Sequence, residues 1–157
     1  MCGPSINSLT IVTLSLFAAV LQAQAREKLS LDRATVISDS DEPSYVQYGV
    51  RELAGYLKEA TGNEVPVLNS PEGAAGVRIV VGAKAAQRVI PEGLPEARAG
   101  EEAYAIRSVS KDGAEYLIAA GATPRGTKAA LGVLMRAIQV EGKSAFVPAS
   151  LNVADKP

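Results

Sequence analysis

The sequence predicts an α+β fold, a two-layer sandwich in which two main helices pack on one face of a mixed β-sheet. Three observations indicate it. Short β-branched runs recur along the chain, two longer segments repeat apolar residues at helical spacing, and the elements alternate as β-α-β-β-(α)-β-β-α-β. We expect one α/β domain over residues 26–150 and a tail or linker over 151–157.

The first strand and helix begin shortly after residue 30. Residues 34–37 are mostly apolar and β-branched, which predicts a strand. Residues 44–61 carry apolar side chains at helical spacing, which predicts a long helix capped by Asp41 or Ser40 and ended by Gly62. Its expected buried stripe consists of Val46, Val50, Leu53 and Leu57.

The middle of the chain supplies two further strands. Residues 65–68 predict a short strand, which Pro66 confines to a sheet edge or a strand end. Residues 77–81 are almost continuously apolar, as in a strand buried on both faces, so we place them centrally. A short helix is expected over 83–89.

A hairpin and a second helix complete the pattern. Residues 102–109 and 114–119 alternate in hydropathy and are joined through Asp112-Gly113, a hairpin signature. Thr123 is expected to cap a helix that Gly142 ends, and residues 145–147 to add a last strand. The expected buried stripe of this helix consists of Leu131, Leu134, Met135 and Ile138.

The first 25 residues differ from all that follow. They contain no Asp, Glu, Lys or Arg, and their apolar run from Leu9 to Leu21 is shorter than the roughly 20 residues that span a bilayer. Ala23-Gln24-Ala25 supplies a small-x-small cleavage site. We expect a signal peptide over 1–25 cleaved after Ala25, and a secreted or periplasmic mature chain with no membrane segment. A buried N-terminal helix is the alternative.

The composition excludes several kinds of chemistry. Histidine is absent, so no Ser-His-Asp or Cys-His arrangement exists, and the single cysteine, Cys2, leaves with the leader. Zinc, copper and non-haem iron sites usually need imidazole or thiolate ligands, so we expect no metal and no cofactor. Lys+Arg total 16 against 17 Asp+Glu, so the composition lacks the excess of basic residues that is typical of nucleic-acid-binding proteins.

Three stretches resemble a known domain. The first reads Tyr48-x2-Arg-Glu-Leu-Ala-x-Tyr-Leu-x2-Ala-Thr-Gly62 and is followed by Val-Pro-Val67; the second is Ile-Val-Val-Gly82; the third runs from Gly121 to Leu134 as Gly-x4-Gly-Thr-x-Ala-Ala-Leu-x2-Leu. Together they resemble the non-catalytic N-terminal domain of glycoside hydrolases, such as family 20 β-hexosaminidases and family 67 and 115 α-glucuronidases. The resemblance covers about residues 33–150.

The resemblance implies an accessory domain of polysaccharide breakdown rather than a hydrolase. In those enzymes the catalytic carboxylates lie in a (β/α)8 barrel of about 250 residues, which would follow the end of this sequence. The implied partner is a glycoside hydrolase catalytic domain or a carbohydrate. Two alternatives stay open: a free-standing carbohydrate-binding or protein-interaction module, and a small carboxylate-dependent glycosidase.

Few side chains are candidates for a site, and none is assigned a catalytic role. The acidic pairs are Asp39 with Asp41, Glu52 with Glu59, and Glu101 with Glu102; caps, exposed helix faces and loops account for them. The helical spacing points Tyr48 away from the apolar stripe, so it is a candidate for sugar stacking or domain contact. Arg125 lies in the turn 121–127, where backbone N–H groups at a helix start can bind an anion; helix capping is the alternative.

Overall fold

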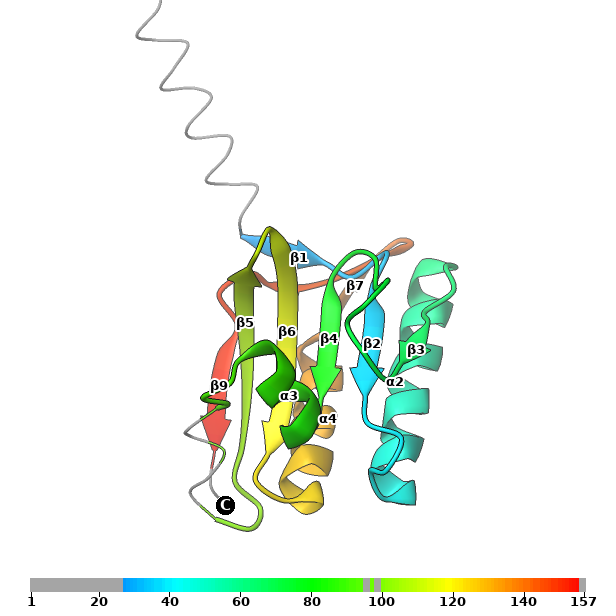
Figure 1. The fold of residues 1–157 in the computed structure, drawn as a ribbon. Helices are drawn as coiled ribbons and strands as arrows, with labels where there is room; N and C mark the ends of the chain where they lie inside the picture. Colours follow the sequence, from blue (N-terminus) through cyan, green and yellow to red (C-terminus); the bar gives the residue numbers. More distant parts are fainter. Residues whose placement is uncertain (1–26, 95–96, 98–99, 156–157) are drawn as a thin grey trace, which may run out of the picture.

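The main sheet of the protein has six strands. The computed structural model describes residues 27–94, 97 and 100–155. Strands β3, β2, β4 and β6 run parallel, and β5 and β9 extend the sheet in antiparallel pairings, so the sheet is mixed as predicted (Figure 1). In spatial order the strands are β3 (Val67–Leu68), β2 (Thr35–Ser38), β4 (Arg78–Val81), β6 (Ala114–Gly121), β5 (Tyr104–Lys111) and β9 (Asn152–Asp155).

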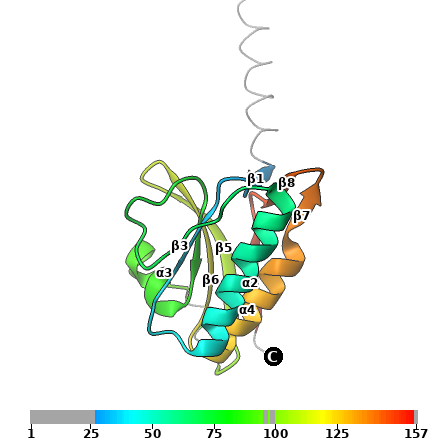
Figure 2. The same cartoon turned by 90° about the vertical axis from the view of Figure 1, so that its right-hand side faces the viewer.

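Two long helices cover one face of this sheet, as predicted. Helices α2 (Ser44–Thr61) and α4 (Pro124–Ala137) lie side by side behind it (Figures 1 and 2). Both helices lay apolar stripes on the strands, and the predicted stripe of α2 is fully buried. In the stripe predicted for α4, Leu131 and Leu134 are buried, Met135 is only partly buried, and Ile138 is buried just beyond the end of the helix. The helices approach closely where Gly49 meets Leu131, at a point where an added Cβ would lie 3.0 Å from the leucine.

A third, short helix extends the expected two-layer arrangement. Helix α3 (Ala83–Val89) lies on the opposite face of the sheet from α2 and α4 (Figure 2). It buries Ala85, Ala86 and Val89 against strand residues such as Val80 and Ile118, which form a second apolar cluster. The sheet is therefore covered on both faces, as the continuous apolar run of β4 requires.

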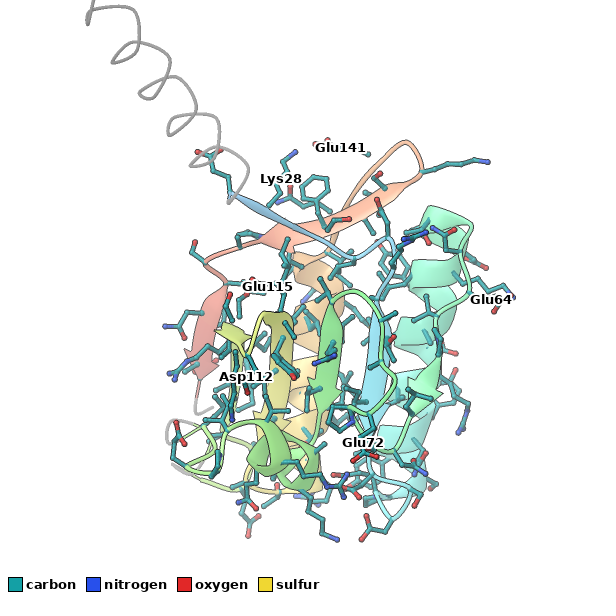
Figure 3. All side chains as sticks on the ribbon, turned by 45° about the horizontal axis from the view of Figure 1, so that its top comes forward. Lys28, Glu64, Glu72, Asp112, Glu115 and Glu141 are labelled. Carbon is teal, nitrogen blue, oxygen red and sulfur yellow. The ribbon has the colours of Figure 1, made fainter. Side chains whose placement is uncertain are left out.

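A second, three-stranded sheet closes one end of the helix layer. It consists of β1 (Lys28–Ser30), β8 (Ser144–Pro148) and β7 (Gln139–Glu141), all antiparallel. On its outer side the Lys28 ammonium lies 3.1 Å from Glu141 Oε1 and 3.9 Å from the centre of the Phe146 ring (Figure 3). The sequence predicted only β8 of this sheet.

Most of the predicted local signals are confirmed. Val67–Leu68 is an edge strand and β4 is central. The hairpin turns through Asp112 and Gly113 with φ of 51° and 74°, the left-handed values that suit a type I′ turn. Gly62 ends α2 in the left-handed conformation, and the Thr123 side chain accepts a hydrogen bond from the Gly126 N–H at the start of α4.

Three expectations are corrected. Helix α2 begins at Ser44, so Pro43 rather than Asp41 or Ser40 occupies its N-cap position, without a side-chain cap; Asp41 is bound to Lys84 of α3. Helix α4 ends at Ala137, and Gly142 turns the β7–β8 hairpin with φ of 63°. Residues 152–155, expected in the tail, form β9 because β5 offers them a free backbone edge.

The predicted signal peptide, residues 1–25, lies outside the described residues. Within the described ranges, no helix is long and apolar enough to cross a membrane.

Candidate functional site

The carboxyl ends of the parallel strands meet at one edge of the main sheet, which is where open α/β sheets usually bind ligands. The chain leaves β2, β4 and β6 at this edge through residues 39–43, Gly82 and residues 121–123. A crevice of about 310 Å³ lies here, with Glu42, Lys84 and the start of α4 among its walls. The crevice is lined by charged groups from the loop after β2 and from α3.

Residues 39–43, the acidic loop, are bound to α3 by two ion pairs. Asp39 Oδ1 lies 2.6 Å from Arg88 Nη2, and the Asp41 carboxylate contacts the Lys84 ammonium. Arg88 also donates to the carbonyl oxygen of Asn69 at 2.6 Å, so it joins the loops after β2 and β3. Lys84 and Arg88 are four residues apart on one face of α3, which lets one helix hold both carboxylates.

The ion pair shifts the pKa of both Asp41 and Lys84. The hydrogen bond from Lys84 lowers the pKa of Asp41, and the same bond raises the pKa of Lys84. The Asp41 contribution to stability is therefore present above its ordinary pKa of 3.8 and is lost as the pH falls through the lowered value. The Lys84 contribution is present below 10.5 and is lost as the pH rises through the raised value.

Glu42, the third carboxylate of the loop, forms no salt bridge with a described residue and is half-buried at the end of β4. Burial raises its pKa, and the neighbouring carboxylates Asp39 and Asp41 raise it further. Its carboxylate lies so close to Gly82 that a Cβ there would clash with it, and Gly82 has φ of 99° and ψ of 155°, a conformation essentially restricted to glycine. A protonated Glu42 carboxyl can act as a general acid. The neighbouring carboxylates that would have to act as base or nucleophile beside it, Asp39 and Asp41, are ion-paired with α3.

The turn 121–127 is built for close packing and capping. A Cβ on Gly121 would clash with the backbone of Gly126, so the two glycines let α4 start directly against the end of β6. The Gly126 N–H donates to Thr123 Oγ1 at 3.3 Å, and the Gly121 N–H donates to Thr127 Oγ1 at 3.2 Å. The bond from Gly126 uses an N–H group of the helix start that an anion would need, and it favours the capping interpretation of this turn.

Arg125 points to a different place, the outer face of α4. There it lines a shallow groove of about 540 Å³, which we call the α4 groove. The groove is lined by Glu102, Tyr104, Arg125, Lys128, Ala129, Gly132, Val133, Arg136 and Asp155. In the described part of the chain, none of its three cations forms a salt bridge.

Tyr48 lies on the outer face of α2, as the helical spacing predicts, with 58% of its surface exposed. Tyr45 is 42% exposed, whereas Tyr56 is partly buried and packs on the core. Tyr48 does not line the α4 groove, so the structure leaves the two sequence-predicted candidates, Tyr48 and Arg125, on different surfaces.

The predicted carboxylate pairs do not form a shared cleft. Glu52 and Glu59 are exposed along α2, and Glu101 and Glu102 are exposed before β5, where only Glu102 lines the α4 groove. Among the described residues, no group of three or more carboxylate, histidine or cysteine side chains is placed to hold a metal ion.

Sequence analysis missed Glu42, Lys84 and Arg88. The spacing of four between the two cations on a short predicted helix is a usable signal for an ion-paired face. Their partners lie 43 and 49 positions away in the sequence, so no local pattern indicates the pairing.

Comparison with known proteins places the fold. No family model and no curated protein matches the sequence. Among solved structures, a family GH115 4-O-methyl-α-glucuronidase with specificity for decorated arabinogalactans matches with a TM-score of 0.60 and 17% identity over 83% of this chain. An inactive mutant of the GH20 exo-β-N-acetylglucosaminidase of Vibrio harveyi matches with a TM-score of 0.53 and 13% identity, also over 83%. The chain spans only 18% and 17% of those proteins, so it has the fold of one part of these glycoside hydrolases.

Proposed function

We propose that this chain is an exported, non-catalytic accessory domain of the glycoside-hydrolase type, which acts beside a catalytic barrel in polysaccharide breakdown. The observation that carries the proposal is the structural match, which covers 83% of this chain but less than a fifth of two glycoside hydrolases. The matched part is a small fraction of each enzyme, which supports an accessory role for this chain. The sequence resemblance points to the same families.

The arrangement of carboxylates supports a non-catalytic role. Glycoside hydrolysis needs two carboxyl groups about 5–10 Å apart across the scissile bond, one of them with a raised pKa. Glu42 has a raised pKa, but its acidic neighbours Asp39 and Asp41 are ion-paired with α3. A carboxylate held by a cation is a poor nucleophile or base, so the cluster is better explained as a clamp on the loop.

Genomic DNA on both sides of the reading frame tests the accessory role. We expect a frame that encodes a (β/α)8 barrel, intact or interrupted, next to this one. If no such frame lies nearby, the link to a catalytic barrel is overturned.

Turnover assays test whether the chain is itself an enzyme. We expect residues 26–157 to leave aryl-glycosides unhydrolysed. Hydrolysis that disappears in Glu42→Gln, Glu52→Gln or Glu102→Gln would establish the small-glycosidase alternative instead.

Mass spectrometry of the protein recovered outside the cytoplasm tests the predicted export separately. We expect the chain to begin at Arg26, and an uncleaved leader would contradict the signal peptide.

The α4 groove favours a second candidate, a carbohydrate-binding module that works without a fused barrel. Its three cations, which form no salt bridge with a described residue, can bind acidic substituents, and the exposed Glu102 carboxylate can accept from hydroxyl groups. Calorimetric titration with xylan, chitin and uronic-acid oligosaccharides tests it, and no heat with any of these glycans would contradict it.

A further inference from the structure

The outer face of α4 carries a stripe of positive charge that forms no salt bridge within the described ranges. Arg125, Lys128 and Arg136 are exposed and separated by three and eight residues, which places them on one side of the helix. Four cations elsewhere in the described residues, Lys28, Lys58, Lys84 and Arg88, each form an ion pair. Because the formal net charge of the chain is −1, this stripe is a local feature and does not follow from a basic composition.

Small side chains open the floor of the α4 groove between these cations. Ala129 and Gly132 lie along the stripe, and an added Cβ at Gly132 would meet only Arg136 Nη1, at 3.6 Å. A glycine inside a helix lowers the free energy of unfolding by about 0.5–1 kcal/mol relative to alanine. A functional role of the open space at Gly132 would explain why the helix carries it. Here the missing side chain lets another molecule approach the helix backbone between charged neighbours.

We propose that the α4 groove binds an acidic polysaccharide, whose carboxylate or sulfate groups are recognised by Arg125, Lys128 and Arg136. The proposal rests on the proposed carbohydrate-related function and names the ligand class. Guanidinium groups bind carboxylate and sulfate oxygens through paired N–H donors, and the Lys128 ammonium adds a point charge.

The exposed Glu102 carboxylate favours a glycan over an acidic peptide. Glu102 lines the groove beside the cations. Sugar hydroxyl groups can donate hydrogen bonds to this carboxylate while acidic substituents accept from the cations. The ionised side chains of an acidic peptide only accept hydrogen bonds, so they can bind the cations but offer Glu102 no donor.

Paired charge variants test the groove. The triple variant Arg125→Gln, Lys128→Gln, Arg136→Gln removes the stripe, and a control triple variant, Arg33→Gln, Arg51→Gln, Lys143→Gln, removes the same charge from exposed positions outside the groove. Calorimetry measures binding to polygalacturonate, dextran sulfate, neutral dextran and polyglutamate at low and high salt. We expect the wild-type chain to bind an acidic glycan, more weakly at high salt. The stripe variant should bind at least about tenfold more weakly, and the control should bind like the wild-type chain.

A space-filling variant gives a readout that does not depend on charge. Gly132→Leu should occupy the groove and weaken binding severalfold, whereas Gly55→Leu, at an exposed position of α2 with nothing within 4 Å, should leave binding unchanged. Thermal unfolding of both variants checks that each is folded.

The outcomes separate this inference from the proposed function. Polygalacturonate and dextran sulfate distinguish carboxylate from sulfate ligands. The inference is overturned if no acidic glycan binds, if both charge triples weaken binding equally, or if polyglutamate binds as tightly as the glycans. Binding of neutral dextran, xylan or chitin oligosaccharides that is unchanged in the stripe variant would support the carbohydrate-related function. It would at the same time overturn the α4 groove as the binding site. A missing barrel frame would instead overturn the accessory role without affecting the groove.

Discussion

Two charged regions of this protein have opposite organisation. At the carboxyl edge of the main sheet, Asp39 and Asp41 are each bound by a cation of α3, and Glu42 is half-buried against Gly82. Along the α4 groove, three cations are exposed and, among the described residues, form no salt bridge. The first arrangement uses charge to hold a loop, and the second leaves charge accessible to another molecule.

The two regions differ in how accessible their charges are to a ligand. Open parallel sheets commonly bind ligands at their carboxyl edge. Here that edge is occupied by the protein's own ion pairs, which connect the β2–α2 loop to the helix on the opposite face. The ligand site that we propose lies instead on the helix layer, where Arg125, Lys128 and Arg136 form no salt bridge with a described residue.

The largest effect is expected at Gly121, where the two regions meet. Gly121 ends β6 at the carboxyl edge and supports the start of α4, and a Cβ there would clash with the Gly126 backbone. We expect Gly121→Val to lower the free energy of unfolding by about 3 kcal/mol, because overpacking forces α4 off the sheet. Urea denaturation followed by circular dichroism measures it. The control Gly55→Ala, in open space on α2, should raise stability by about 0.5–1 kcal/mol.

The position of Glu42 over Gly82 is tested next. Gly82→Ala places a side chain in a glycine-only conformation and against the Glu42 carboxylate, so we expect a loss of about 2 kcal/mol. Gly62→Ala, also at positive φ but with nothing within 4 Å, should cost about 1 kcal/mol. Equal losses in urea denaturation would show that the contact with Glu42 adds nothing to the backbone strain.

The same substitution in the two regions compares them directly. Arg88→Gln leaves Asp39, whose side chain is only 13% exposed, without its cation, and should cost about 1–2 kcal/mol. Arg125→Gln removes a cation with no salt bridge and should change stability by less than about 0.5 kcal/mol. Thermal unfolding of both variants measures the difference. A similar loss in both would mean that Arg125 is also structural, and that the two regions are not opposites.

The smallest expected effect is the pH dependence of Glu42. A carboxyl group whose pKa is raised on folding lowers stability once it ionises, so stability from this group falls as the pH rises through the window above its ordinary pKa of 4.5. Glu42→Gln should therefore be more stable than the wild-type chain at neutral pH, by about 0.5 kcal/mol after screening by solvent. The advantage should vanish below pH 4.5, and an advantage that persists there would rule out ionisation as the cause.

Local signals predicted most of the fold because their causes are local. The stripe of α2 follows from helical spacing, the Asp112-Gly113 turn from left-handed φ values, and the Thr123 cap from a hydrogen bond to a residue three positions away. Strands β1 and β9 were missed because each is short and stabilised mainly by pairing with a distant strand, Lys28 with Pro148 in one case and Tyr104 with Asp155 in the other.

The candidate site was much less predictable than the fold. Arg125 was identified, but for an anion-binding turn; the structure instead points its side chain into a groove shared with Arg136 and Asp155. Glu42 was overlooked because its raised pKa depends on burial and on two neighbouring carboxylates. These properties depend on distances between segments, which no sequence pattern contains.

The sequence by itself determined the α+β class, the two long helices, the central strand, the hairpin and the lack of histidine chemistry, because spacing and composition govern these properties directly. The tertiary structure alone decided which charges are neutralised. The acidic loop meets Lys84 and Arg88 only because β2 and β4 are neighbours in the sheet. The cations of α4 face a groove because the opposite side of that helix is buried against the same sheet.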